Sequence, residues 1–137
     1  MNSAGATFWV DTFRAFSSGL SFTTQYRWSG EDVDEDDPDS WPDVTGRAPG
    51  TTRVRFTATV DGELWSNDER DPRPLHLLGG GTIPTLSTVR WWLPRLPTRE
   101  LSFAFRDSRR GLDGTAALPT LQPVIDARGQ VIPLSVL

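Results

Sequence analysis

The chain of 137 residues contains no cysteine and no lysine, and it has one histidine and one methionine. Without cysteine there is no disulfide scaffold, no thiol nucleophile and no thiolate site for zinc or an iron–sulfur cluster. A single histidine leaves little for a proton shuttle or a metal centre. No run approaches 18 consecutive apolar residues, so we expect no membrane-spanning helix. The first residues show no basic stretch followed by a long apolar one, so we expect no secretory signal.

Charge is unevenly distributed along the chain. The formal net charge is −4, and eight of the 18 acidic residues lie between Glu31 and Asp43. Without those eight, the 14 basic residues outnumber the acidic ones and the remainder is mildly basic. All the basic residues are arginine, which a GC-rich genome explains, although planar bidentate contacts to carboxylates or phosphates are an alternative reason. The acidic balance argues against nucleic acid as a partner, because phosphate contacts supply most of that affinity.

Strand patterns dominate the sequence. Apolar and polar residues alternate over residues 20–28, 53–60 and 101–106, and a period of two is typical of strands with one buried face. Asp61-Gly62 follows the second stretch directly and predicts a tight hairpin turn, with Leu64 to Ser66 as the return strand.

Further short strands are predicted from β-branched and aromatic residues between turn signals. They cover residues 7–16, 75–78, 87–93, 124–126 and 131–134. We expect the glycine run 79–81 to end the second of these as a flexible loop, and the last two to form a hairpin with Pro133 at a sheet edge. No stretch has an uninterrupted helical period, so we expect little or no helix.

These elements predict an all-β fold, an antiparallel β-sandwich of the Ig-like or jelly-roll-like kind with roughly seven to nine short strands. No linker divides the chain, so residues 1–137 are expected to form one domain with a long acidic loop at about 29–51. A loop of that length in a compact domain is typically either functional or disordered.

Several short motifs recur in one order along the chain: the glycine run 79–81, the stretch 89–94 with two adjacent tryptophans, Leu96-Pro97, residues 101–103 and residues 110–112. Together with residues 14–22, they resemble a small, uncharacterised all-β family of high-GC Gram-positive bacteria. The resemblance covers about half of the chain and leaves out the acidic loop and the last twenty residues. It implies a bacterial, cytoplasmic, all-β domain and brings no known activity.

The acidic loop has the partial spacing of a calcium site. Asp32, Asp34 and Asp36 fall at the first, third and fifth positions of such a loop, and Asp43 at the twelfth. Asp37, however, stands at the sixth position, where the turn needs glycine, and no helices are expected on either side. The pattern favours a solvated charge run. A negative docking surface for a basic partner is the alternative with a function.

Six tryptophans are a second feature of the sequence. Trp28 continues an apolar strand face and is expected in the core. Trp91 and Trp92 are adjacent, so they point to opposite sides of a strand. Trp41 lies in the acidic loop and is the best candidate for an exposed anchor of the kind enriched in interface hot spots. Exposed tryptophan with nearby aspartate is also compatible with a carbohydrate-binding module.

Catalytic motifs are weak. His76 is the only histidine for a Ser-His-Asp triad, it stands between two leucines, and no Gly-x-Ser-x-Gly elbow exists. The glycine run lacks the Gly-Lys-Ser/Thr ending of a phosphate-binding loop. Arg109 and Arg110 form a small basic corner that could contact a carboxylate, a phosphate or the acidic loop. We therefore expect no enzyme and no cofactor.

The resulting hypothesis is a non-catalytic protein–protein interaction or assembly module of a bacterial cytoplasm. Its partner would be another protein or a second copy, and neither nucleic acid nor a membrane. The candidate binding residues are Asp34, Asp36, Asp37, Asp39, Trp41, Arg109 and Arg110. The alternative is a small-ligand module that binds carbohydrate or calcium through tryptophan and aspartate.

Overall fold

The computed structural model describes residues 2–3, 6–28, 44–45, 54–83, 86–107, 111–117, 132–133 and 135–136. The strands are β1 (Asn2–Ser3), β2 (Ala6–Phe16), β3 (Gly19–Trp28), β4 (Arg55–Val60), β5 (Glu63–Ser66), β6 (His76–Ile83), β7 (Leu86–Leu93), β8 (Leu101–Asp107), β9 (Leu112–Ala117), β10 (Ile132–Pro133) and β11 (Ser135–Val136). Among these residues there is no helix, and so none long and apolar enough to cross a membrane.

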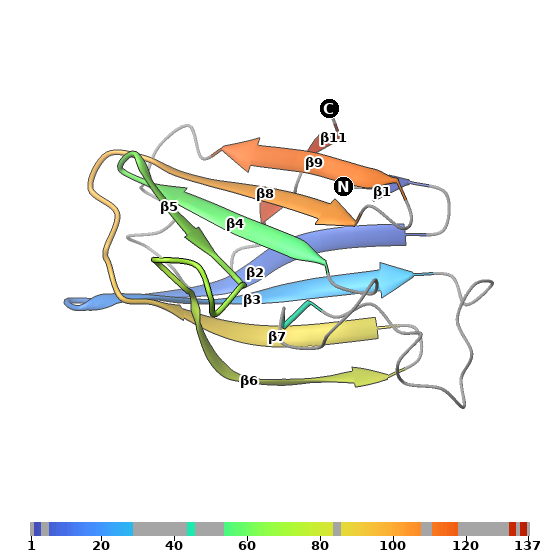
Figure 1. Ribbon diagram of the computed structural model, residues 1–137, viewed down its shortest axis with the longest axis horizontal. Coiled ribbons are helices and arrows are strands. Elements are labelled where there is room, and N and C mark those ends of the chain that lie inside the picture. Colours follow the sequence, from blue (N-terminus) through green and yellow to red (C-terminus); the bar gives the residue numbers. More distant parts are fainter. Residues whose placement is uncertain are drawn as a thin grey trace.

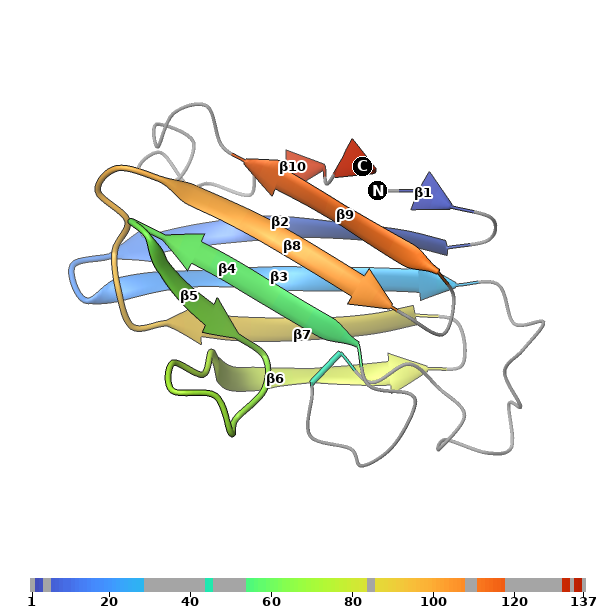
Figure 2. The ribbon, with the colours of Figure 1, turned by 45° about the horizontal axis from the view of Figure 1, so that its top comes forward.

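The strands form two sheets that are stacked as layers (Figures 1 and 2). The first sheet has the order β1-β2-β3-β7-β6, with β10 also paired to β2, and the second has the order β11-β9-β8-β4-β5. Every pair of strands is antiparallel. The predicted all-β antiparallel β-sandwich of short strands is therefore confirmed.

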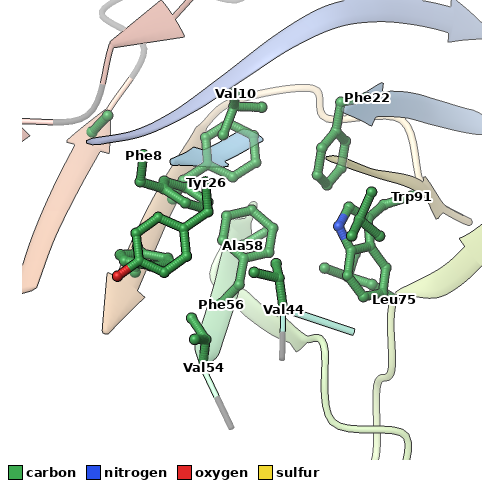
Figure 3. Close-up of a cluster of buried hydrophobic side chains, with 14 of the residues drawn as sticks. Phe8, Val10, Phe22, Tyr26, Val44, Val54, Phe56, Ala58, Leu75 and Trp91 are labelled. Atoms are coloured by element: carbon green, nitrogen blue, oxygen red, sulfur yellow. The ribbon is translucent and has the colours of Figure 1, made fainter. Parts of the chain in front are cut away.

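The core lies between the sheets and is rich in aromatic rings (Figure 3). Inward positions of β2, β3, β4 and β8 alternate with outward ones, as the period of two predicts. Phe8 of the first sheet stacks on Phe105 of the second with ring centroids 3.8 Å apart, and Phe22 meets Phe103 edge-on at 5.4 Å. Each such pair contributes about 0.5–1.5 kcal/mol beyond the area it buries.

Tryptophan placement follows the strand period. Trp28 and Trp91 are buried, with exposed fractions of 2% and 1%. The indole N–H of Trp91 donates to the hydroxyl of Thr24 at 3.0 Å, so its one polar atom is satisfied inside the core. Trp92 is only half-buried and lies on the opposite side of β7. The predictions for all three tryptophans are confirmed.

The Asp61-Gly62 turn between β4 and β5 has the positive φ angles, 49° and 85°, of the predicted hairpin. The Asp61 carboxylate also accepts hydrogen bonds from the backbone N–H groups of Thr98, Arg99 and Glu100 at 2.9, 2.7 and 2.9 Å. Desolvation raises the pKa of Asp61, but these backbone bonds and one from the Thr98 hydroxyl outweigh it. The pKa is therefore held well below its ordinary value of 3.8.

The glycine run departs from the prediction. Gly79, Gly80 and Gly81 belong to β6 and pair with β7, and they do not form a loop. Gly80 has φ 146°, and a Cβ there would meet the carbonyl oxygen of Thr88 on β7. The run is tolerated in a strand because β7 supplies the ladder, and at Gly80 β7 approaches too closely for any side chain.

Strand β9 was not predicted. Its inward positions, Leu112, Gly114 and Ala116, are mostly small and give a weak apolar signal, yet all three are buried beside β8. The strand predicted over residues 131–134 is confirmed at Ile132–Pro133. Ile132–Pro133 pairs with β2 and Ser135–Val136 pairs with β9, so this segment contributes to both sheets. Its predicted hairpin partner, residues 124–126, lies outside the described residues.

Asn67 joins three segments inside the core. Its side-chain amide nitrogen donates to the carbonyl oxygens of Val44 and Val54 at 2.7 and 2.8 Å, and its oxygen accepts from the N–H of Phe56 at 3.0 Å. Val44, which falls within the predicted acidic loop, is 1% exposed and belongs to the core. One residue of that loop is thus an anchored part of the sandwich.

Candidate functional site

A groove of about 490 Å³ lies on the outer face of the first sheet. Its residues come from the end of β2, the β2–β3 turn, β3, β6 and β7. They are Thr12, Arg14, Phe16, Ser18, Ser21, Phe22, Thr23, Leu78, Arg90 and Trp92. None of these residues was predicted from the sequence to be a binding residue.

Short side chains of β3 form the floor of the groove. β3 runs between β2 and β7 (Figure 1), so each outward residue of β3 has a neighbour on both sides. Ser21 is in register with Arg14 and Trp92, while Thr23 is in register with Asp11 and Arg90. Because Ser21 is smaller than Arg14 and Trp92, and Thr23 is smaller than Arg90, the sheet surface is hollowed along β3.

A β-bulge in β2 turns Arg14 outward. The pairing moves from Asp11 with Thr23 to Arg14 with Ser21, so two residues of β2, Thr12 and Phe13, lie opposite one residue of β3. Thr12 takes the positive φ of 53° that this kind of bulge uses. Phe13 is consequently buried at 1% exposed, and Arg14 is exposed on the groove side.

A second bulge, in β6, presents Leu78 to the groove. Leu77 pairs with Trp91 and Gly79 pairs with Arg90, so Leu78 is the extra residue, with an exposed fraction of 51%. A Cβ on Gly79 would lie 3.6 Å from a guanidinium nitrogen of Arg90, which places that guanidinium over β6. Bulges are frequent beside binding sites, where they re-aim side chains.

The indole ring of Trp92 lies over Gly19 at the start of β3. A Cβ on Gly19 would be only 2.6 Å from the six-membered ring of Trp92, so glycine is needed there for the indole to keep this position. The ring of Phe16, which is 51% exposed, packs against Trp92 with centroids 5.8 Å apart. The two rings form an apolar wall at one end of the groove.

Two arginines, Arg14 and Arg90, are among the described residues that line the groove. Within the described residues, neither Arg14 nor Arg90 forms an ion pair, and no acidic residue lines the groove. The nearest carboxylate along β2, that of Asp11, accepts hydrogen bonds from the indole N–H of Trp9 at 3.0 Å and from the Thr12 hydroxyl at 3.2 Å. The groove therefore combines an apolar wall with two guanidinium groups that have no ion-pair partner among the described residues.

The second sheet has a smaller outer depression of about 230 Å³. It is lined by Arg55, Thr57, Ala104, Phe105, Arg106 and Asp113. Here Arg55 forms an ion pair with Asp71 at 3.1 Å, and Arg106 is in register with Asp113 across the β8–β9 pair. Each arginine of this depression therefore has an acidic residue beside it.

The candidate residues from the sequence lie outside the described residues. This applies to Asp34, Asp36, Asp37, Asp39, Trp41, Arg109 and Arg110, and also to the predicted calcium positions Asp32 and Asp43. Their grouping therefore stays a prediction. The sequence did contain a signal for the groove: with Trp91 in the core, Trp92 had to point outward, but its neighbours depend on strand order.

His76 is exposed at the start of β6, in register with Trp92. Among the described residues it forms no hydrogen bond to a hydroxyl or carboxylate, and no group of three or more histidine, aspartate or glutamate side chains could hold a metal ion. The groove itself offers guanidinium donors, hydroxyl groups and aromatic faces. This set suits recognition of an anionic, partly apolar ligand.

In comparisons with known proteins, no protein-family model, no curated protein and no solved structure matches the chain. The resemblance to a family of Gram-positive bacteria therefore stays a prediction, and the groove has to be interpreted from its own geometry.

Proposed function

We propose that this protein is a non-catalytic protein–protein interaction module that binds its partner through the groove on the first sheet. The observation that carries the proposal is the composition of the groove: Trp92, Phe16, Arg14 and Arg90 project from one sheet face. Tryptophan, tyrosine and arginine dominate interface hot spots, where a few residues supply most of the binding energy. Sheet strands hold these side chains more rigidly than loops would, which lowers the entropy lost on binding.

A protein partner is favoured over a carbohydrate. Sugar recognition needs hydrogen-bond acceptors for hydroxyl groups as well as an aromatic face. The groove has an aromatic face, but the described residues that line it include no carboxylate and no side-chain amide. Its strongest polar groups are two guanidiniums, which only donate hydrogen bonds and carry charge. An anionic protein segment uses both features.

The cellular setting and a second docking surface are parts of the same proposal. A bacterial cytoplasm is the location that the family resemblance suggests. The acidic stretch around Asp34, Asp36 and Asp37 would form a separate, negative surface for a basic partner.

Comparative affinity capture from native lysate tests the role of the groove. Three baits are compared: the wild-type chain, a groove variant with Arg14→Glu and Arg90→Glu, and a control variant with Arg27→Glu and Arg106→Glu. The control makes the same change in net charge at two exposed strand positions outside the groove. Arg27 lies on the first sheet and Arg106 on the second. Candidates retained by wild type and control are then purified and titrated directly.

The proposal predicts at least one purified protein that binds wild type and control equally and binds the groove variant at least tenfold more weakly. Equal binding of every captured protein to all three baits would rule out the groove as the interaction surface.

A further inference from the structure

The spacing of the two groove arginines indicates what the partner presents. Arg14 lies on β2 in the row of Ser21, and Arg90 lies on β7 in the row of Thr23. They are thus separated by two strand spacings across the sheet and by two residues along it. With strands about 4.8 Å apart and a rise of about 3.3 Å per residue, their Cα atoms are roughly 12 Å apart on a diagonal over β3.

An extended peptide matches this diagonal. Side chains at positions i, i+2 and i+4 of a strand point to the same side, and positions i and i+4 are about 13 Å apart. Two carboxylates at i and i+4 would therefore match the spacing of the Arg14 and Arg90 Cα atoms, and the Arg90 side chain, whose guanidinium lies over β6, would turn toward β3 to meet the second carboxylate. The residue at i+2 would lie over the floor of Ser21 and Thr23, beside Trp92.

We propose that the groove binds an extended segment of another protein in which two acidic residues flank an apolar one, in the pattern Asp/Glu-x-apolar-x-Asp/Glu. The proposal rests on the proposed function and specifies the partner's chemistry. Its physical basis is charge complementarity. Two guanidiniums without ion-pair partners among the described residues stand on either side of a hydroxyl floor, and an apolar wall adjoins them. Charge-assisted contacts of this kind fix both register and orientation of a bound segment.

Other anionic ligands fit less well. The groove is open along the sheet face, whereas small-molecule sites enclose most of their ligand. Single-stranded nucleic acid also combines phosphate with stacking bases. A polyanion is disfavoured because the described residues that line the groove include only two arginines and the formal net charge of the chain is −4.

Fluorescence anisotropy with synthetic peptides tests the inference. The probe is a fluorescein-labelled peptide Ser-Thr-Glu-Thr-Leu-Thr-Glu-Thr-Ser, titrated with the purified full chain at low ionic strength. One control peptide replaces both glutamates by glutamine, and another replaces leucine by serine. We expect the glutamine peptide to bind at least tenfold more weakly, the serine peptide to bind severalfold more weakly, and affinity for the probe to fall with salt.

Variants of the chain localise the binding. Arg14→Gln and Arg90→Gln should each weaken the probe severalfold, and Trp92→Ala should do the same, while Arg27→Gln leaves affinity unchanged. A double-mutant cycle adds a readout that altered folding would not imitate. Arg14→Gln and loss of one particular glutamate should be coupled, and Arg90→Gln should be coupled to the other one.

Three outcomes would overturn the inference. The first is equal affinity of the chain for the glutamate and glutamine peptides, and the second is tighter binding of a thymidine oligonucleotide than of the probe. The third is self-association of the chain that displaces the bound probe. If the peptides fail but capture still depends on Arg14 and Arg90, only the acidic chemistry is refuted. If capture is indifferent to those arginines, the proposed function fails as well.

Discussion

The two outer faces of the sandwich differ although both belong to antiparallel sheets in one small domain. Around the groove, β2 and β6 each contain a β-bulge, Phe16 and Leu78 are exposed, and Trp92 is half-buried. Arg14 and Arg90 form no ion pair among the described residues. On the second sheet, β4, β8 and β9 pair without a register shift, and Arg55 is paired with Asp71. The comparison shows that local register and charge pairing, more than fold class, separate a candidate binding face from a neutral one.

The largest expected effect comes from filling the space beneath Trp92. A Gly19→Ala variant places a methyl group against the carbonyl oxygen of Leu93 and against the indole. We expect a loss of about 1–3 kcal/mol in the free energy of unfolding, because overpacking forces backbone or ring movement. Urea titration measures the loss, and probe binding should weaken because Trp92 leaves Phe16.

Ala104→Ser on the second face is the matched control, since Ala104 is half-buried beside ordinary strand neighbours. It should change stability by less than about 0.5 kcal/mol. Equal effects of the two substitutions would mean that Gly19 has no special role in placing the indole.

The next effect concerns the second sheet, where Asp61 ties the β4–β5 turn to residues 98–100. Asp61→Asn keeps the shape and tolerates the positive φ but removes the charge. We expect a loss of about 1–2 kcal/mol at neutral pH, because the amide NH2 group of asparagine cannot accept the backbone hydrogen bonds that one carboxylate oxygen accepts. Urea titration of both proteins across a pH series measures it.

The pH dependence of that difference has a definite sign. The pKa of Asp61 in the folded protein lies below its ordinary value of 3.8. Its contribution to stability is therefore fully present above about pH 4 and is lost as the pH falls below that value. The stability gap between wild type and Asp61→Asn should narrow in acid. A gap that stays constant down to pH 2 would contradict the assignment.

The smallest effect tests the bulge that turns Arg14 outward. A positive φ is unfavourable for threonine, so Thr12→Gly should raise the free energy of unfolding by up to about 1 kcal/mol if the bulge is kept. Probe binding should be unchanged, because Arg14 keeps its orientation. A destabilised variant that also loses probe binding would show that the Thr12 side chain itself maintains the bulge.

Prediction from sequence succeeded where one residue type decides one local geometry. Alternation placed β3, β4 and β8, the Asp-Gly pair placed a hairpin, and adjacency assigned Trp91 and Trp92 to opposite faces. It failed where a neighbouring strand decides. The glycine run is a strand because β7 approaches it closely, and β9 is a strand although Gly114 and Ala116 carry little apolar signal.

The candidate site shows the same division more sharply. Arg14, Phe16, Leu78 and Arg90 gather around Trp92 only because β2, β3, β7 and β6 are neighbours in that order. The two bulges depend on pairing register as well, and register is a property of two strands together. The residues proposed from charge runs, Asp34, Asp36, Asp37, Asp39, Trp41, Arg109 and Arg110, all lie outside the described residues, so their role stays a prediction.

The sequence alone determined that this chain forms strands with buried aromatic faces and no disulfide scaffold. The alternation of apolar and polar residues, the turn residues and the absence of cysteine were enough for this. These are short-range properties, because steric preference and alternation act within a few residues. Only the tertiary structure decided which strands are neighbours, where extra residues interrupt the ladders and which arginines have no ion pair among the described residues. Such contacts join positions far apart in the chain, and their energies exist only once the two sheets have formed.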